Sequence, residues 1–295
     1  MKVLITGNLG AIGSSLSKNL ESNGILFQGF DNRYPYDHPF FGDIRDQERL
    51  KKAMFKCDGV IHLAAISRVL DAQNDSEKTI EVNVQGTQNI IDSLNKNQWL
   101  IFTSSREVYG KSSVIKLGEH SPSNPQNLYG LSKSMAEETI RNHCKGSYTI
   151  LRLTNVYGSL TDRSERLIPS LVRCALENKP ITVFGPERCF DFVHIHDICN
   201  GFIGVIDKMA KSSKITNQIL NLTSGEGVRL SEVADQCRKL SKSDIPIHYG
   251  LHKNYEVDNF IGDPRQAKQV LNWEAKIPFA TGLNNYIEQC KQGVL

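Results

Sequence analysis

Residues 2–13 read KVLITGNLGAIG, a short apolar run followed by three glycines. The apolar run predicts a buried parallel strand, because strands covered on both faces carry near-continuous hydrophobic side chains. Ile12, Leu16 and Leu20 then share one face of a predicted helix. This order is typical of dinucleotide-binding proteins, in which the pyrophosphate meets N–H groups at the helix N-terminus. The glycine spacing matches the commoner G-x-G-x-x-G pattern only approximately, so a turn without a ligand stays an alternative.

Asp31 strengthens the case for a dinucleotide. Residues 25–30 predict a second strand, and Asp31 follows it, 18 positions after Gly13. A carboxylate at this place accepts hydrogen bonds from both ribose hydroxyls and repels a 2′-phosphate, which favours NAD over NADP. Arg33, two residues further on, would soften that preference. The alternative is that Asp31 is a turn residue before Asn32.

Composition limits the classes of protein to which the chain can belong. The 295 residues exceed one ordinary domain, and the formal net charge of +3 is spread out, with no basic block longer than Lys51 and Lys52. We therefore expect no nucleic-acid partner. No apolar stretch reaches transmembrane length, and the first residues run into a strand instead of a secretory signal. We expect a cytoplasmic protein with no membrane partner.

The seven cysteines show neither metal-binding nor disulfide spacing. They are scattered, form no C-x-x-C or Cys/His pattern, and are odd in number, so we expect no metal site and no disulfide framework. We interpret the cysteines as free thiols of a protein in a reducing compartment.

Strands and helices alternate along the first half of the chain. Strands are expected at 59–64, 99–103 and 148–153, and helices at 76–94 and 127–144. This alternation predicts an α/β fold, a doubly wound parallel sheet of the Rossmann type with right-handed crossovers. Ligands of such sheets gather at the carboxyl ends of the strands, where Gly7, Asp31, Ala64, Ser105 and Asn155 would meet.

The second half is less regular and contains more prolines, which predicts a smaller C-terminal lobe for the substrate. We expect residues 1–156 and about 181–207 to form the NAD-binding Rossmann domain. Residues from about 157–180 and 208–295 would form the substrate-binding lobe.

Ser105, Glu107, Tyr129 and Lys133 form a candidate set for moving protons at a sugar hydroxyl. A Tyr-x-x-x-Lys pair alone proves little, since Tyr249 begins a second one, but the first pair opens a predicted helix behind a strand that ends in hydroxyl residues. Free tyrosine, with a pKa of about 10, is a poor base. An ammonium one helical turn away stabilises the phenolate and brings that pKa toward the working pH. Ser105 would hydrogen-bond the same sugar oxygen, and the alternative for Tyr129 is packing on the sheet.

Further motifs follow in order along nearly the whole chain. After the glycine turn and Asp31 come GDI (42–44), HLAA (62–65), NVQGT (83–87), SSREVYG (104–110), YGLSK (129–133), RLTNVYG (152–158), FVHIHD (192–197), DPRQA (263–267) and LNW (271–273). The ordered set resembles the extended short-chain dehydrogenase/reductase superfamily, in its NAD-dependent nucleotide-sugar epimerase/dehydratase branch. The resemblance implies that NAD is the cofactor and a nucleotide-diphosphate sugar is the substrate.

The resemblance also implies which residues hold each ligand. For the cofactor these are Gly7, Gly10, Ala11, Ile12, Gly13, Asp31, Asn32, Asp43, Ile44, Leu63, Ala64, Ala65, Asn83, Tyr129 and Lys133. For the substrate they are Ser67, Arg106, Asn155, Arg188 and Lys253. Asp43 and Ile44 would lie at the adenine. A homodimer formed through helices at 76–95 and 127–144 is implied as well.

Two substitutions depart from the resemblance at substrate contacts. Phe190 replaces an expected arginine, and Arg188 lies two residues earlier, on the same face if the segment is extended. Lys253 replaces a second arginine, and lysine lacks the bidentate fork that binds a phosphate.

Glu107 bears on which reaction the chain performs. In the sugar dehydratases and uronate decarboxylases that the chain resembles, the corresponding glutamate moves protons, whereas in the 4-epimerases the position is commonly not acidic. The dTDP-glucose dehydratases place an aspartate just before it. This chain has Arg106 there, which cannot donate a proton at neutral pH. The alternative is that Glu107 only pairs with Arg106 or with a lysine.

The Ser105, Tyr129 and Lys133 set, together with Asp31, predicts an NAD-dependent nucleotide-sugar epimerase that acts at C4 through a transient 4-keto sugar. The alternatives are a 4,6-dehydratase or uronate decarboxylase that uses Glu107, a 4-keto-sugar reductase, and a non-catalytic NAD-binding protein.

Overall fold

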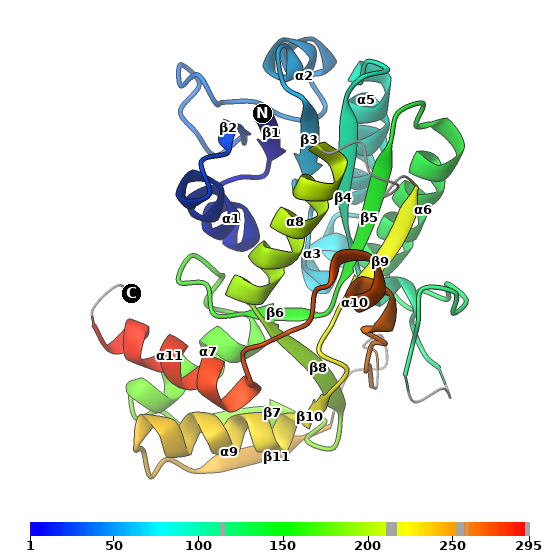
Figure 1. Ribbon diagram of the computed structural model, residues 1–295. Helices are drawn as coiled ribbons and strands as arrows, with labels where there is room; N and C mark the ends of the chain where they lie inside the picture. The colour runs from blue at the N-terminus through cyan, green and yellow to red at the C-terminus, as the bar shows by residue number, and fades with distance from the viewer. Residues whose placement is uncertain (113–115, 211–216, 252–256, 258, 293–295) are drawn as a thin grey trace.

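The computed structural model describes residues 1–112, 116–210, 217–251, 257 and 259–292 (Figure 1). Within these residues, six strands form a parallel sheet in the order β2-β1-β3-β4-β5-β9. The strands are β1 (Lys2–Thr6), β2 (Leu26–Phe30), β3 (Gly59–His62), β4 (Trp99–Ser105), β5 (Tyr148–Leu153) and β9 (Gln218–Leu222). The chain runs outward from β1 to β2 and then crosses back to β3, so the switch point lies between β1 and β3. This confirms the predicted doubly wound fold.

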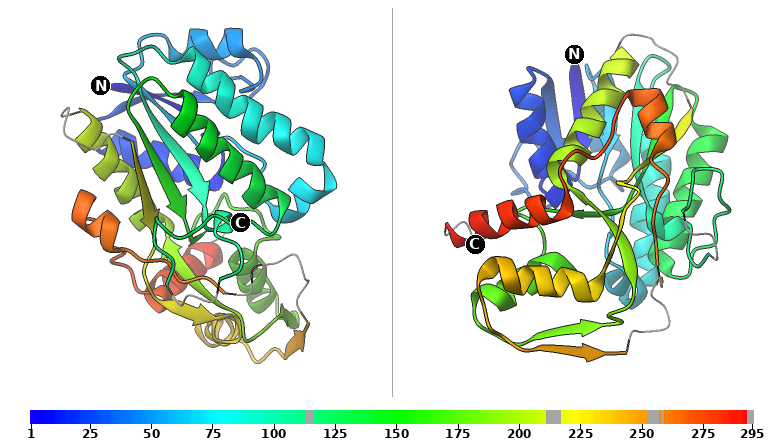
Figure 2. Two further views of the ribbon diagram at one scale, coloured as in Figure 1. Left: turned by 90° about the vertical axis from the view of Figure 1, so that its right-hand side faces the viewer. Right: turned by 60° about the horizontal axis from the view of Figure 1, so that its bottom comes forward.

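Helices cover both faces of this sheet (Figures 1 and 2). One face carries α1 (Ala11–Ser22), α8 (Ile195–Ala210) and α10 (Arg265–Leu271). The other carries α2 (Gln47–Met54), α5 (Gly86–Ser93) and α6 (Leu128–His143). Alternate residues of β1 point to opposite faces, because side chains alternate along a strand. Val3 and Ile5 pack with α1 and α8, and Leu4 packs with α2 and α5.

The second lobe lies below the sheet in Figure 1. Among the described residues it contains a three-stranded and a two-stranded sheet. The strands are β6 (Asn155–Tyr157), β8 (Cys189–His194) and β10 (Gly227–Arg229) in the first, and β7 (Ile181–Phe184) and β11 (Ile247–Gly250) in the second. The helices α7 (Leu167–Leu176), α9 (Leu230–Ser241) and α11 (Phe279–Lys291) pack around a separate apolar core.

The placement of four elements, β7, β8, β9 and α10, differs from the predicted domain boundaries. The predicted lobe, 208–295, includes β9 and α10, but β9 pairs with β5 and α10 packs on the same side of the main sheet as α8. Leu220 and Leu222 are fully buried there, and their strand covers an edge of β5 that would otherwise stay unpaired. Conversely, β7 and β8 were expected in the Rossmann domain, but β7 pairs with β11, and β8 with β6 and β10, in the second lobe.

The helix predicted at 76–94 is divided into three parts. It consists of α4 (Ser76–Ile80), a π-helical turn η1 (Glu81–Gln85) and α5, preceded by the short α3 (Val69–Asn74). Such π turns often re-aim a side chain at a functional site. Here the turn carries Asn83, whose amide reaches the loop that follows β3.

Candidate active site

A cleft of about 1030 Å³ opens at the carboxyl ends of the main strands, between the two lobes. Most of the predicted site residues line it. They are Gly7, Gly10, Ala11, Ile12, Gly13, Asp31, Asn32, Asp43, Ile44, Leu63, Ala64, Ala65, Ser67, Ser105, Arg106, Glu107, Tyr129, Lys133 and Asn155. Asn83 and Arg188 do not line it, and Lys253 lies outside the described residues.

Two glycines of the turn after β1 occupy places where a Cβ would collide with the protein backbone. Gly7 has a φ of +74°, and a Cβ there would lie 2.7 Å from the backbone nitrogen of Ala64. A Cβ on Gly13 would lie 2.3 Å from the carbonyl oxygen of Gly7. The turn delivers the chain to α1, whose N-cap, Gly10, provides no side-chain cap. Its first N–H groups therefore face the cleft as an anion site, which fits a dinucleotide pyrophosphate.

Asp31 stands at the end of β2 in a strongly hydrogen-bonded setting. Its side chain is 4% exposed and accepts the backbone N–H groups of Leu9 and Arg33, both at 3.0 Å, and the guanidinium fork of Arg33. Burial alone would raise the pKa of Asp31, but these donors outweigh it and lower the pKa. Asp43 is paired in the same way by Arg45, which lowers its pKa to about 2, and it also accepts the Asn32 amide at 3.2 Å.

The end of β4 and the start of α6 bring the proposed proton-handling groups together. Asn127 caps α6, its side-chain oxygen accepting the Gly130 N–H at 2.9 Å. Tyr129 lies in the first turn, and Ser105 acts to lower the pKa of its hydroxyl. One turn later, Lys133 donates from Nζ to the carbonyl of Thr103 at 2.8 Å. The serine, the tyrosine and the lysine thus meet at one wall of the cleft.

Burial shifts both members of the tyrosine–lysine pair away from their charged forms. It raises the pKa of Tyr129, although the Ser105 hydrogen bond and the charges of Arg166 and Arg106 act to lower it. It lowers the pKa of Lys133 to about 7, against a smaller opposite effect of Glu137. A cationic ligand group beside Tyr129 would favour its phenolate, since an opposite charge nearby favours the ionised form.

Glu107 has a partner on each carboxylate oxygen. Its Oε1 lies 2.9 Å from Nη2 of Arg106, and its Oε2 accepts the Asn127 amide at 2.8 Å. The residue is 8% exposed. Glu107 therefore links the end of β4 to the cap of the helix that carries Tyr129.

Arg106 is held by polar and aromatic contacts. Its Nε donates to the side-chain oxygen of Asn155 at 3.2 Å, and its guanidinium lies 4.6 Å from the centre of the Phe190 ring. Phe190 stands where the resemblance places an arginine, so here it supports an arginine that comes from β4. The Nη1 atom is buried and has no hydrogen-bond partner among the described residues.

Sequence reasoning missed the loop between β6 and α7. Ser159, Thr161, Asp162, Arg163 and Arg166 line the cleft. Arg166 donates to the hydroxyl of Ser67 at 3.2 Å, and Arg163 pairs with Asp71, so this loop joins the two lobes across the cleft. In the sequence the segment is a polar run between two apolar ones, a pattern that indicates only a surface loop.

Asn83 and Arg188, which were predicted to contact the cofactor and the substrate, do not line the cleft. Asn83 is buried, and its amide binds the backbone of Ile66 and the hydroxyl of Ser132. Any effect of Asn83 on a cofactor would therefore pass through the loop after β3. Arg188 donates to the carbonyls of Phe184 and Val257 and lies 5.4 Å from the centre of the Phe190 ring. Its role toward substrate stays a prediction.

The described parts of the chain contain neither a metal-binding cluster nor a membrane-spanning helix. There, no group of three or more His, Cys, Asp or Glu side chains is arranged to hold a metal ion. Within those same parts, no helix combines the length and the apolar character needed to cross a membrane.

Three features define a Rossmann-type dinucleotide-binding protein. They are the parallel sheet, the glycine turn at its switch point, and the tyrosine–lysine pair beside the same cleft. Residues 3–222 match the NAD dependent epimerase/dehydratase family, and the chain belongs to this family. Membership confirms the predicted class of enzyme and NAD as its cofactor.

Individual relatives match over nearly the full length. The UDP-glucose 4-epimerase of Lactobacillus helveticus is 29% identical, over 94% of this chain and 92% of the relative. The UDP-N-acetyl-alpha-D-glucosaminuronate decarboxylase of Bacillus cytotoxicus is 28% identical, over 97% of each chain. Among solved structures, MoeE5 in complex with UDP-glucuronic acid and NAD has a TM-score of 0.89 and 26% identity, over 99% of each chain.

Proposed function

We propose that the protein is an NAD-dependent nucleotide-sugar 4-epimerase. The observation that carries this proposal is the meeting of Ser105, Tyr129 and Lys133 at the cleft whose glycine turn suits NAD. Tyr129 takes the proton of the C4 hydroxyl, Ser105 orients the same oxygen, and the Lys133 ammonium favours the phenolate. When bound, NAD supplies the hydride acceptor and a positive ring. Hydride returned to the other face of the transient 4-keto sugar gives the epimer.

The setting of Glu107 favours epimerisation over elimination or decarboxylation. A proton-transferring glutamate needs an oxygen that reaches the substrate. Here one oxygen is paired with Arg106 and the other with Asn127. Glu107 then positions the Tyr129 helix without transferring protons itself.

Product mass and stereochemistry test this proposal. The purified protein is incubated with UDP-, dTDP-, GDP- and CDP-sugars, with and without added NAD, and products are followed by NMR and mass spectrometry. A diastereomer of unchanged mass is expected. Loss of water or of carbon dioxide would instead identify a dehydratase or a decarboxylase and assign proton transfer to Glu107.

An acidic sugar is a second candidate substrate, and the charges around Tyr129 favour it. Arg106 and Arg166 both act on the Tyr129 hydroxyl. Among the described residues, the Nη2 of Arg166 donates to the hydroxyl and the carbonyl of Ser67, at 3.2 and 3.4 Å, and its Nε lies 3.4 Å from Oδ1 of Asp162. A sugar carboxylate would replace the Ser67 acceptors with a stronger charge-assisted pair. UDP-glucuronic acid, the ligand in the MoeE5 complex, is such a substrate.

Replacing Arg166 by glutamine tests this substrate class. We expect Arg166→Gln to lower kcat/KM for UDP-glucuronate at least about tenfold, and kcat/KM for UDP-glucose by less than about threefold, because only the acid loses a charged partner. Arg163→Gln is the matched control, since it removes a cation from the same loop that pairs with Asp71. Equal losses on both sugars would mean that Arg166 does not select the acid.

We also propose a homodimer formed through α5 and α6. Leu131 and Met135 lie one turn apart on α6 and are 44% and 37% exposed. Apolar side chains at this spacing suit packing against another helix. Sedimentation equilibrium is expected to give twice the chain mass of 33.1 kDa. The double variant Leu131→Asp, Met135→Asp should sediment as a monomer, and a monomeric wild type would contradict the proposal.

A cytoplasmic location is proposed on the state of the cysteines. All seven lie in the described part of the chain and are free thiols, which is typical of a reducing compartment. Fractionation of the source cells with an antibody to the protein checks this, and recovery in an oxidising compartment would contradict it.

A further inference from the structure

Arg33 compensates the charge of the carboxylate that normally selects NAD. Among the described residues, four N–H groups point at Asp31: the backbone N–H of Leu9, the backbone N–H of Arg33, and Nε and Nη2 of the Arg33 guanidinium. Their distances range from 2.7 to 3.0 Å, and they are shared by both carboxylate oxygens. Since a carboxylate offers about four lone-pair sites, Asp31 is fully engaged by protein donors.

The local chain produces this pairing without help from the rest of the fold. The same Asp-x-Arg geometry recurs at Asp43 with Arg45 and at Asp263 with Arg265, where the backbone N–H and the guanidinium of the arginine both bind the aspartate two residues before. The Asp31–Arg33 pair is therefore one of three examples of the same local arrangement in this chain.

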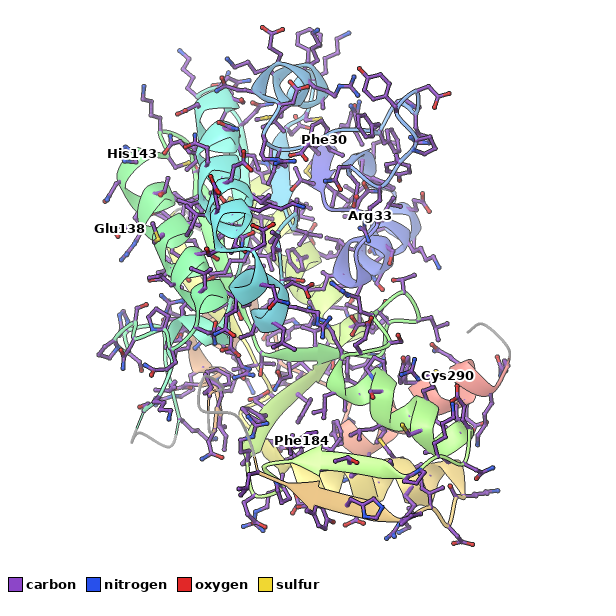
Figure 3. All side chains as sticks on the ribbon, turned by 180° about the vertical axis from the view of Figure 1, so that it is seen from behind. Phe30, Arg33, Glu138, His143, Phe184 and Cys290 are labelled. Atoms are coloured by element: carbon purple, nitrogen blue, oxygen red, sulfur yellow. The ribbon has the colours of Figure 1, made fainter. Side chains whose placement is uncertain are left out.

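The pair is asymmetric in its access to solvent. The Asp31 side chain is 4% exposed, whereas that of Arg33 is 55% exposed. Nη2 of Arg33 lies 3.8 Å from the place that a Cβ of Gly10 would occupy, so the guanidinium sits beside the phosphate-binding turn. Figure 3 shows Arg33 near α1, at the rim of the first lobe. A ligand at the end of β2 meets the arginine first.

A compensated aspartate repels a 2′-phosphate much less than a bare one. NAD selectivity depends on the aspartate accepting the ribose hydroxyls and opposing the phosphate by its charge. Here the formal charge of the pair is zero, and its exposed member is a cation with a bidentate fork suited to phosphate. Arg45, the neighbouring cation, is already bound to Asp43 and Glu81.

We propose that the cleft accepts NADP as well as NAD, and that Arg33 turns from Asp31 to the 2′-phosphate when NADP binds. For NAD, the ribose hydroxyls displace the same fork from Asp31, so Arg33 competes with NAD and assists NADP. This inference concerns cofactor binding alone. It stands or falls independently of the sugar and of the reaction proposed above.

Binding measurements without catalysis test the inference. Full-length protein depleted of cofactor is titrated with NAD and with NADP by calorimetry. We expect Arg33→Ala to raise the ratio of the NADP Kd to the NAD Kd at least about fivefold, through weaker NADP and unchanged or tighter NAD binding. Arg265→Ala removes the arginine of the same local motif outside the cleft and should leave the ratio unchanged. A smaller rise, or no detectable binding of NADP to the wild type, overturns the proposal.

Discussion

Tyr129→Phe is expected to lower kcat by about 10²–10⁴-fold while NAD binding and thermal stability stay close to those of the wild type. The substitution deletes only the phenolic oxygen, the group proposed to accept the sugar proton. The ring keeps its place in the first turn of α6. Turnover is measured by NMR on the accepted nucleotide sugar, and cofactor binding by calorimetry.

The second Tyr-x-x-x-Lys sequence offers a matched control. Tyr249 lies on β11, is 54% exposed and does not line the cleft. Tyr249→Phe should therefore leave kcat unchanged within about twofold, as surface changes away from a site usually do. If Tyr129→Phe retained wild-type kcat, the assignment of Tyr129 as the base would be wrong.

Lys133→Met is expected to lower kcat by a similar factor and to change how stability depends on pH. Without the ammonium, the Tyr129 phenolate loses its stabilising charge. Methionine keeps an unbranched side chain in a place that is 3% exposed. The hydrogen bond to the Thr103 carbonyl is lost, which costs about 1 kcal/mol at every pH.

The pH dependence has a definite sign. Burial lowers the pKa of Lys133 from its ordinary 10.5 to about 7. Between these values the unfolded chain holds a proton that the folded chain has released, so stability rises with pH. The burial penalty is fully present below about pH 7 and fades toward pH 10.5. Lys133→Met should therefore be more stable than wild type at pH 6, by on the order of a few kcal/mol, and lose that advantage by pH 10.

Denaturant unfolding of both proteins between pH 6 and 10 measures this difference. The free energy of unfolding of the wild type is subtracted from that of the variant at each pH. The contributions of the other titrating groups cancel in this difference, because both chains contain them. Lys268→Met is the control, since it removes a lysine whose side chain is 64% exposed. A flat difference for Lys133→Met would show that Lys133 stays protonated in the folded protein.

Much of the site could be predicted because its signals are local. The glycine turn, the aspartate after β2 and the Tyr-x-x-x-Lys spacing each act within one turn, strand or helix, and the structure places them all around one cleft. The predictions were less complete where a side chain meets a distant segment. Asn83 reaches Ile66, and Arg166 reaches Ser67 across 99 positions. No periodic pattern in the sequence predicts these contacts between distant segments.

The sequence by itself determined the doubly wound sheet, the family, NAD as the cofactor and the residues proposed for proton transfer. The sheet follows from side-chain periodicity, which the chain obeys locally, whereas the family and its cofactor rest on the resemblance of the ordered set of motifs. The tertiary structure alone decided that β9 completes the sheet, that Glu107 is bound by Arg106 and Asn127, and that Arg166 binds Ser67. The reason is physical: a polar side chain has many possible partners of similar strength, and only the packed core determines which of them comes within reach.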